Sequence, residues 1–292
     1  MSTIPITGAL GQLGSELREL SSHYGGYTFI FTDVEDLDIT DAHQTGSFIK
    51  AASPDWIVNC AAYTAVDKAE DDVAGATKIN TTGVKNIADA ISGSECRLIH
   101  ISTDYVFDGS KNTPYREDDV TRPVTVYGKT KLAGEEAALR HPYTVILRTS
   151  WLYSSYGNNF VKAILKKAGS GEDPRVVFDQ TGSPTYAADL ASAVMDIISG
   201  VIRNRLVFSP GIYNYSNEGV CSWFDFATEI IREAGSSCSV KPILTSERPP
   251  AAARPWYSVL DKKKIKETYD LSIPYWRDSM IKCISKLSKN HG

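Results

Sequence analysis

The sequence predicts an α/β protein in which a doubly wound, Rossmann-like parallel sheet is followed by a smaller C-terminal substrate lobe. Three observations predict this fold. A glycine-rich turn at residues 8–14 separates the first strand from the first helix, which lets a backbone approach a phosphate group. Strand-like and helical runs alternate as far as residue 150, which is the order of a parallel sheet covered by helices. Residues 56–62 form an almost continuously apolar run, typical of a strand buried on both faces.

The first strand is expected at residues 3–7 and the first helix continues to residue 20. Between them Gly8, Gly11 and Gly14 follow a Gly-x-x-Gly-x-x-Gly spacing. The backbone of such a turn and the N–H groups at the helix N-terminus can bind a pyrophosphate. We therefore count these glycines as cofactor-binding candidates. Pro5 cannot donate a hydrogen bond to a central strand, so a local defect is expected there.

The second strand, residues 27–32, ends at Asp33, which lies 19 positions after Gly14 (33 − 14). At this distance an acidic residue meets the ribose 2′-hydroxyl of an adenosine, and its charge favours NAD over NADP. The alternative is an ordinary aspartate at a strand end. A helix to residue 52 follows, with Thr40 as its expected N-cap.

The third strand, in residues 56–62, ends in small side chains. Ala61 and Ala62 leave room for a flat ring or a phosphate chain. A long helix is then expected from about residue 73 to residue 92. It carries Asn80, which we also count among the cofactor-binding candidates.

The fourth strand, residues 97–102, is followed by Thr103, and ligands of parallel sheets bind beyond such strand ends. A helix capped by Thr125 then carries Tyr127 and Lys131, four residues apart and hence on one face. A nearby cation favours the ionised phenol. Lowering the tyrosine pKa by about two units, worth about 3 kcal/mol, would make Tyr127 a proton donor near neutral pH. The alternative is a surface pair at helical spacing.

A strand at residues 143–148 completes the first half, and the alternation then loosens. We expect residues 1–150 to form a dinucleotide-binding domain and residues 151–292 mainly a substrate lobe, with elements around 175–215 returning to the sheet. The later elements are expected as helices at 160–168, 189–198, 223–234 and from Pro274, and as strands at 176–178 and 212–215.

The composition excludes several classes of protein. The chain of 292 residues is 42% hydrophobic, and its formal net charge of −4 gives no footprint for nucleic acid or an anionic membrane. Five cysteines form no Cys-x-x-Cys pair and no metal-ligand spacing with the five histidines, which fits reduced thiols in the cytoplasm. No signal peptide or apolar run of transmembrane length is found. We expect a cytoplasmic protein without membrane or nucleic-acid partners.

These motifs resemble the extended short-chain dehydrogenase/reductases and, within them, the dTDP-4-dehydrorhamnose reductase family. The resemblance runs nearly from end to end. It rests on residues 6–17, 59–70, 102–109, 127–135, 148–151, 157–160, 179–189 and 254–261.

The resemblance implies a catalytic trio of Thr103, Tyr127 and Lys131. Tyr127 would give a proton to the substrate oxygen while NADPH or NADH delivers hydride to C4. Lys131 would hold the nicotinamide ribose and lower the tyrosine pKa, and Thr103 would hydrogen-bond the carbonyl. The other implied cofactor contacts are Gln12, Leu13, Asp33, Asp38, Ile39, Ala61, Ala62 and Tyr63.

The resemblance also implies substrate contacts. Asp104 and Trp151 match sugar-contacting positions; a carboxylate orients hydroxyls and an indole face suits the apolar side of a deoxysugar. Arg254 matches a late arginine of the family and suits a diphosphate. A surface salt bridge is the equal alternative for Arg254.

Metal and oligomeric state stay open at this stage. Some members of the family bind Mg²⁺ through acidic residues at a dimer contact. Glu16 and Asp189 match two of these positions, but no C-terminal third partner is visible. We therefore assign no metal ligand, and a monomer and a homodimer are both compatible with the sequence.

The implied function is reduction of the C4 ketone of dTDP-6-deoxy-L-lyxo-4-hexulose to dTDP-L-rhamnose. One alternative is another nucleotide-sugar enzyme, an epimerase, reductase or dehydratase. Dehydratases carry Asp-Glu after the threonine, whereas Thr103 precedes Asp104-Tyr105 here. Another is a non-catalytic NAD(P)-binding regulatory protein, since the regulatory β subunit of methionine adenosyltransferase resembles this family. The presence of Tyr127 and Lys131 beside Thr103 favours an enzyme.

Overall fold

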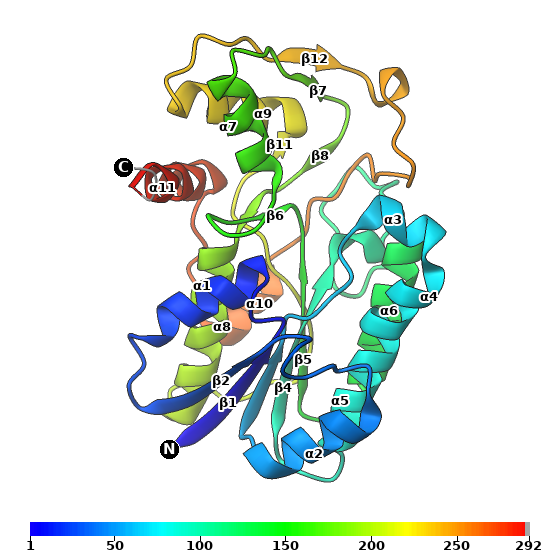
Figure 1. Ribbon diagram of the computed structural model, residues 1–292, viewed down its shortest axis with the longest axis vertical. Helices are drawn as coiled ribbons and strands as arrows, with labels where there is room; N and C mark the ends of the chain where they lie inside the picture. Colours follow the sequence, from blue (N-terminus) through cyan, green and yellow to red (C-terminus); the bar gives the residue numbers. More distant parts are fainter. Residues whose placement is uncertain (290–292) are drawn as a thin grey trace.

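A six-stranded parallel sheet forms the centre of the computed structural model, which describes residues 1–289 (Figure 1). Every strand pair in this sheet is parallel, and the order is β10-β5-β4-β3-β1-β2. From β1 the chain adds β2 on one side and then β3, β4, β5 and β10 on the other, so the strand order reverses between β1 and β3. The predicted doubly wound fold is therefore confirmed. The strands are β1 (Ser2–Thr7), β2 (Tyr27–Thr32), β3 (Trp56–Asn59), β4 (Arg97–Thr103), β5 (Thr144–Thr149) and β10 (Gly211–Asn214).

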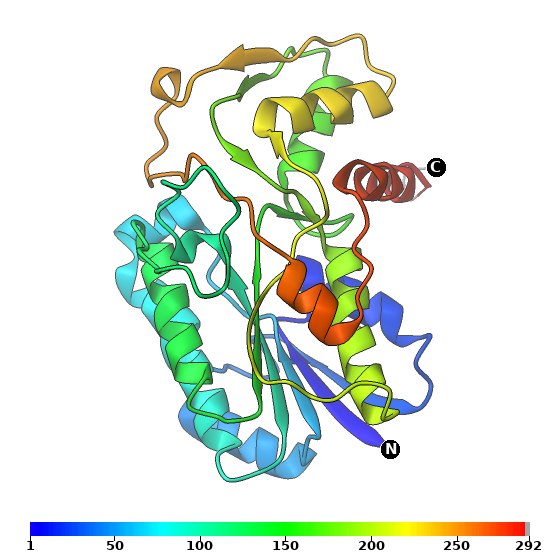
Figure 2. The ribbon, with the colours of Figure 1, turned by 180° about the vertical axis from the view of Figure 1, so that it is seen from behind.

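Helices cover both faces of the sheet because successive strand residues alternate in direction. Trp56 and Val58 pack towards α1 and α8, whereas Ile57 packs towards the helices of the opposite face. Figure 2 shows α8 and α10 from behind on the same side as α1. The covering helices are α1 (Gln12–Ser21), α8 (Ala187–Ile202) and α10 (Lys263–Tyr269) on one face, and α2 (Ala42–Ala52), α3 (Val66–Asp71), α4 (Val73–Thr77), α5 (Val84–Ala90) and α6 (Val126–Ala138) on the other.

The local defect expected at Pro5 is confirmed. β1 pairs with β2 along its whole length but with β3 only from Ile6 onwards. The carbonyls of Thr3 and Thr7 accept hydrogen bonds from the β3 side. Pro5 lies two residues from each of them, so its backbone faces the same neighbour, and its missing N–H removes one hydrogen bond between β1 and β3.

Two helix predictions are wrong in detail. Asp41, not Thr40, caps α2: its carboxylate accepts a hydrogen bond from the Gln44 N–H at 2.9 Å. The single helix expected near residues 73–92 is interrupted by a π-helical segment, Lys78–Gly83. In this widened turn the Asn80 carbonyl lies against Gly134 of α6. π-Helical segments occur often at functional sites.

The remaining strands form small two-stranded sheets in a lobe above the carboxyl ends of the main strands (Figure 1). Its core gathers Tyr153, Phe226 and Trp276. The strands pair as β6 (Leu152–Tyr153) with β9 (Thr185–Tyr186), β8 (Thr181–Gly182) with β11 (Cys221–Ser222), and β7 (Arg175–Val177) with β12 (Lys241–Ile243). The helices of this lobe are α7 (Phe160–Gly169), α9 (Trp223–Glu233) and α11 (Trp276–Lys289).

Of the later elements expected to return to the main sheet, α8 and β10 do so. β7 does not, because it pairs with β12 instead. The last helix begins at Trp276, two residues after the expected Pro274. The division of the chain into residues 1–150 and 151–292 stays a prediction. Within residues 1–289, no helix combines the length and the apolar character needed to cross a membrane.

Candidate active site

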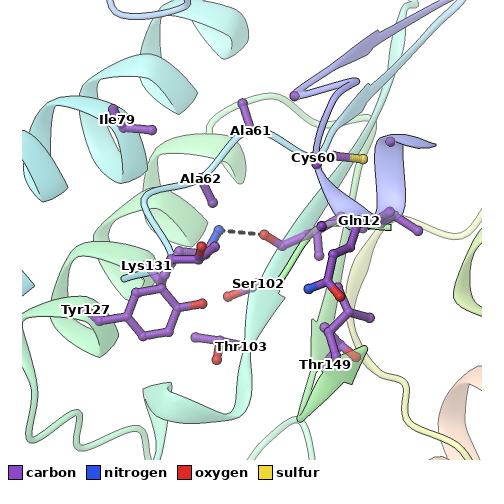
Figure 3. Close-up of a pocket in the computed structure, with 18 of the residues that line it drawn as sticks. Gln12, Cys60, Ala61, Ala62, Ile79, Ser102, Thr103, Tyr127, Lys131 and Thr149 are labelled. Atoms are coloured by element: carbon purple, nitrogen blue, oxygen red, sulfur yellow. Dashed lines mark hydrogen bonds between the residues drawn. The ribbon is translucent and has the colours of Figure 1, made fainter. Parts of the chain in front are cut away.

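A cavity of about 980 Å³ lies where the chain leaves the carboxyl ends of β1, β3, β4 and β5. This volume is at the upper end of the range for ligand pockets, and the place is the switch point of the sheet. Figure 3 shows residues at the ends of β3, β4 and β5 and residues from α1 and α6 around the same space. The expected site residues that line the cavity are Gly8, Gly11, Gln12, Leu13, Gly14, Asp33, Asp38, Ile39, Ala61, Ala62, Thr103, Asp104, Tyr127, Lys131 and Trp151.

The glycine turn packs too closely for side chains. Gly8 has a φ of +64°, and a Cβ there would lie 2.6 Å from the Ala61 nitrogen. A Cβ at Gly14 would lie 2.4 Å from the Gly8 carbonyl oxygen. Gly11 is the N-cap residue of α1, and this helix has neither a side-chain cap nor an acidic residue in its first turn. Its N-terminal N–H groups therefore suit an anionic group.

Two carboxylates line the cavity beyond β2. Asp33 accepts hydrogen bonds from the N–H groups of Leu10 and Val34, both at 2.9 Å. Asp38 accepts from the N–H of Thr40 at 2.9 Å and from its hydroxyl at 2.6 Å, and these bonds lower the pKa of Asp38. The carboxylates are thus held in place by neighbouring donors at this end of the cavity.

The start of α6 fixes where Tyr127 lies. Thr125 caps the helix as predicted, since its hydroxyl accepts a hydrogen bond from the Gly128 N–H at 3.0 Å. Glu70 from α3 accepts from the Val126 N–H at 2.9 Å. Gly128 is required by close packing, because a Cβ there would lie 2.2 Å from the backbone oxygen of Tyr105.

Tyr127 and Lys131 lie side by side and point into the cavity (Figure 3). The Lys131 ammonium donates a hydrogen bond to the Ile101 carbonyl at 2.6 Å. The expectation that Lys131 lowers the pKa of Tyr127 is wrong in this structure. Burial raises the pKa of Tyr127 to about 12, opposed by the Thr103 hydroxyl, and burial lowers the pKa of Lys131 to about 8. Near neutral pH Tyr127 therefore keeps its proton.

Thr103 and Asp104 extend from the end of β4. The Thr103 hydroxyl donates to one Asp104 carboxylate oxygen at 3.0 Å and accepts from the Tyr105 N–H at 3.2 Å. The other carboxylate oxygen of Asp104 is buried and has no hydrogen-bond partner within the described part of the chain. Burial raises the pKa of Asp104 to about 7. This carboxyl group can thus donate or accept a hydrogen bond near neutral pH.

Trp151 lines the cavity, but one of its faces is already covered. Its ring stacks on that of Trp223 with 3.7 Å between centroids and 10° between planes. A side chain at Gly182 would collide with the same indole. Trp151 also has a φ of +49°, a left-handed conformation that costs about 1–3 kcal/mol in a bulky residue. The indole is therefore held in one orientation by its surroundings.

Three expected residues, Tyr63, Asn80 and Arg254, do not line the cavity. The buried Asn80 amide accepts from the Tyr63 N–H at 2.8 Å and donates to its carbonyl at 3.1 Å, so it holds the loop after β3. Arg254 pairs with Asp67 at 2.7 Å. The salt-bridge alternative is thus the one that the geometry supports for Arg254.

The two residues matched to a Mg²⁺ position do not fit a metal site. Glu16 accepts from the Ser154 hydroxyl at 2.6 Å and from the Lys286 ammonium at 3.0 Å. Asp189 accepts hydrogen bonds from the side-chain amide of Asn217 and from the Ser279 hydroxyl. Protein donors thus already bind both carboxylates. Across residues 1–289 no group of three or more His, Cys, Asp or Glu side chains could hold a metal ion.

Sequence reasoning missed several residues of the cavity. Thr149 ends β5 and Ser150 follows it directly, so the rule that ligands bind beyond strand ends could have found them. Lys78 and Ile79 enter through the π-helical segment, for which the sequence gives no clear signal. Further lining residues that the sequence analysis did not assign to the site are Cys60, Thr64, Ser102 and Tyr105.

Comparison with known proteins agrees with this geometry. The model of a family described as "RmlD substrate binding domain" matches residues 1–289. A dTDP-4-dehydrorhamnose reductase of Aggregatibacter actinomycetemcomitans is 40% identical over 287 residues, which are 96% of this chain and 97% of that protein. The crystal structure of a dTDP-4-dehydrorhamnose reductase from Clostridium acetobutylicum is 41% identical, with a TM-score of 0.91 over 98% of this chain and 99% of that one. Another from Bacillus anthracis, in complex with NADP, is 40% identical, with a TM-score of 0.91 over 98% and 100% of the two chains.

Proposed function

Because this chain belongs to the RmlD substrate-binding-domain family, we propose that it reduces the C4 ketone of dTDP-6-deoxy-L-lyxo-4-hexulose to give dTDP-L-rhamnose. NADPH or NADH is the proposed reductant. The proposal rests on one observation: Thr103, Tyr127 and Lys131 line the same cavity as the glycine turn. Relatives named dTDP-4-dehydrorhamnose reductase support this substrate.

The residues of the cavity fit a nicotinamide dinucleotide. A Cβ at Gly8 or Gly14 would collide with backbone atoms, and the uncapped start of α1 offers N–H groups to a pyrophosphate. Asp33 is held by two backbone donors at the end of β2, where it can accept hydrogen bonds from a ribose. Ala61 and Ala62 present small side chains to the same space.

When bound, the reduced nicotinamide supplies the hydride that C4 of the sugar receives. Tyr127 keeps a proton on its hydroxyl oxygen and gives it to the carbonyl oxygen, so that the ketone becomes an alcohol. Thr103 would turn its one hydroxyl proton from the Asp104 carboxylate to the same carbonyl oxygen and donate a hydrogen bond to it. Lys131, whose side chain is buried and whose ammonium lies at the Ile101 carbonyl, would bind the ribose hydroxyls of the cofactor. The two side chains from α6 thereby orient both reactants.

Asp104 and Trp151 are proposed to orient the sugar. The free carboxylate oxygen of Asp104 can meet a sugar hydroxyl, which would satisfy a buried polar atom. Trp151 offers an edge or its remaining face, since Trp223 covers the other. Arg254 is not included in the proposed substrate site because Asp67 binds it.

Turnover separates this proposal from the alternatives. The oxidation of NADPH and of NADH would be followed with dTDP-6-deoxy-L-lyxo-4-hexulose, and dTDP-4-keto-6-deoxyglucose without epimerase would serve as the control. We expect oxidation with the first sugar only. Cofactor binding without turnover would favour a regulatory subunit, and equal turnover of the control sugar would favour another nucleotide-sugar reductase.

Replacement of Asp33 by Ala is expected to weaken NADH binding about tenfold and to leave NADPH binding unchanged or stronger. The variant loses a charged hydrogen-bond acceptor for the 2′-hydroxyl, worth about 1.5–3 kcal/mol, and no longer repels a 2′-phosphate. Both dissociation constants can be measured by fluorescence titration. Glu35→Ala is the matched control, because Glu35 is a nearby exposed acidic residue that does not line the cavity. Equal losses for the two cofactors would contradict the proposed position of Asp33.

A further inference from the structure

A buried ion pair lies directly beneath the proposed catalytic residues. Glu135 on α6 and Arg148 on β5 are 1% and 2% exposed. The guanidinium binds both carboxylate oxygens, through Nε at 2.9 Å and a terminal nitrogen at 2.7 Å. The Ser102 hydroxyl donates to the same carboxylate at 2.5 Å. Neither charged residue lines the cavity, so this pair contacts no ligand there.

Side chains from one face of α6 form hydrogen bonds with two consecutive residues of β4. Lys131 binds the Ile101 carbonyl, and Glu135, one turn later, binds the Ser102 hydroxyl. The next residue of the strand is Thr103. The helix is therefore fixed to the strand immediately before the point where β4 enters the cavity.

We propose that Glu135 is a positioning residue that acts through Lys131, keeping its buried ammonium charged and directed at the cavity. This inference rests on the role that the proposed function gives to Lys131. Arg148 and Ser102 in turn hold the Glu135 carboxylate in place.

The groups around Lys131 come from three elements. Cys60, beyond β3, and His100, on β4, are buried, and burial raises the pKa of the Cys60 thiol to about 12 and lowers that of His100. Tyr127 on α6 also stays neutral because its pKa is raised. Glu135, one turn further along α6, opposes the lowering of the Lys131 pKa by burial, and its ion-pair partner Arg148 lies on β5. Loss of the Glu135 charge would release the Lys131 proton at a lower pH.

A purely structural role makes a different prediction. Buried ion pairs contribute little net stability, and removal of one partner destabilises a protein whatever its function. Such destabilisation would not change the titration of Lys131. The pKa of Lys131 therefore distinguishes the two roles.

The test is an NMR titration of the full chain, without cofactor or substrate, in which lysine is labelled with ¹³C at Cε. The resonance that disappears in Lys131→Arg is that of Lys131. In Glu135→Gln we expect its titration midpoint to fall by about one unit. Glu136→Gln, an exposed neighbour on the same helix, removes an equal charge and should leave the midpoint unchanged.

A second variant covers the outcome that Glu135→Gln fails to fold with Arg148 unpaired. Glu135→Gln combined with Arg148→Met removes both charges, and we expect a midpoint shift in the same direction. An unchanged Lys131 midpoint in the folded variants would overturn the inference, even if they were less stable. Because no substrate is present, a protein that fails to reduce the sugar could still show the shift. Failure of the proposed function is thus distinguishable from failure of this inference.

Discussion

Replacement of Tyr127 by Phe is expected to lower kcat by about 10²–10⁴-fold, the contribution of a positioned proton donor. Only the hydroxyl is lost, and the ring keeps its edge-to-face contact with Tyr105 at 5.4 Å between centroids. Folding and NADPH binding should therefore be preserved. The measurements are steady-state kinetics with the 4-keto sugar, together with thermal unfolding and cofactor titration of the same preparation.

Tyr105→Phe is the informative comparison for this result. Tyr105 also lines the cavity, and burial and the neighbouring Asp104 raise its pKa. Tyr105 lies in the short turn Asp104–Val106 after β4 and not beside Lys131 on α6, so this variant should keep most of its turnover. Near-normal kcat in Tyr127→Phe, with a large loss in Tyr105→Phe, would transfer the role to the other tyrosine.

The main sheet and the glycine turn could be predicted because short-range patterns determine them. The apolar run at Trp56 and the strand-end position of Thr103 are visible in a few consecutive residues. Gly8 and Gly14 likewise indicate their backbone constraint directly. The spacing of Tyr127 and Lys131 predicted that they share a face of one helix, and the structure brings them together.

Features that depend on distant residues could not be predicted in this way. The pKa of Tyr127 is raised because the fold buries the phenol, and no local spacing reports burial. Trp151 stacks on Trp223, and Arg254 meets Asp67, across long separations in the chain. Such contacts arise from the tertiary packing of segments that are distant in the chain rather than from local sequence.

Replacement of Gly8 by Ala is expected to lower the free energy of unfolding by about 2–5 kcal/mol and to weaken NADPH binding about tenfold or more. The φ of +64° is unfavourable for alanine, and its Cβ would lie 2.6 Å from the nitrogen and 2.7 Å from the Cα of Ala61. Backbone atoms cannot turn aside as a side chain can. The glycine turn or the end of β3 must move, and both line the cavity. Urea unfolding and fluorescence titration would measure the two effects.

Gly93→Ala separates the collision from the cost of the backbone conformation. Gly93 has a similar φ of +76°, but a Cβ there would meet no heavy atom within 4 Å. This variant should lose only about 1–2 kcal/mol of stability, the cost of the left-handed conformation, and should bind NADPH normally. If Gly8→Ala behaved in the same way, the close approach of the turn to Ala61 would have no role in shaping the cofactor site. A larger loss of both stability and affinity at Gly8 would instead tie cofactor binding to that backbone contact.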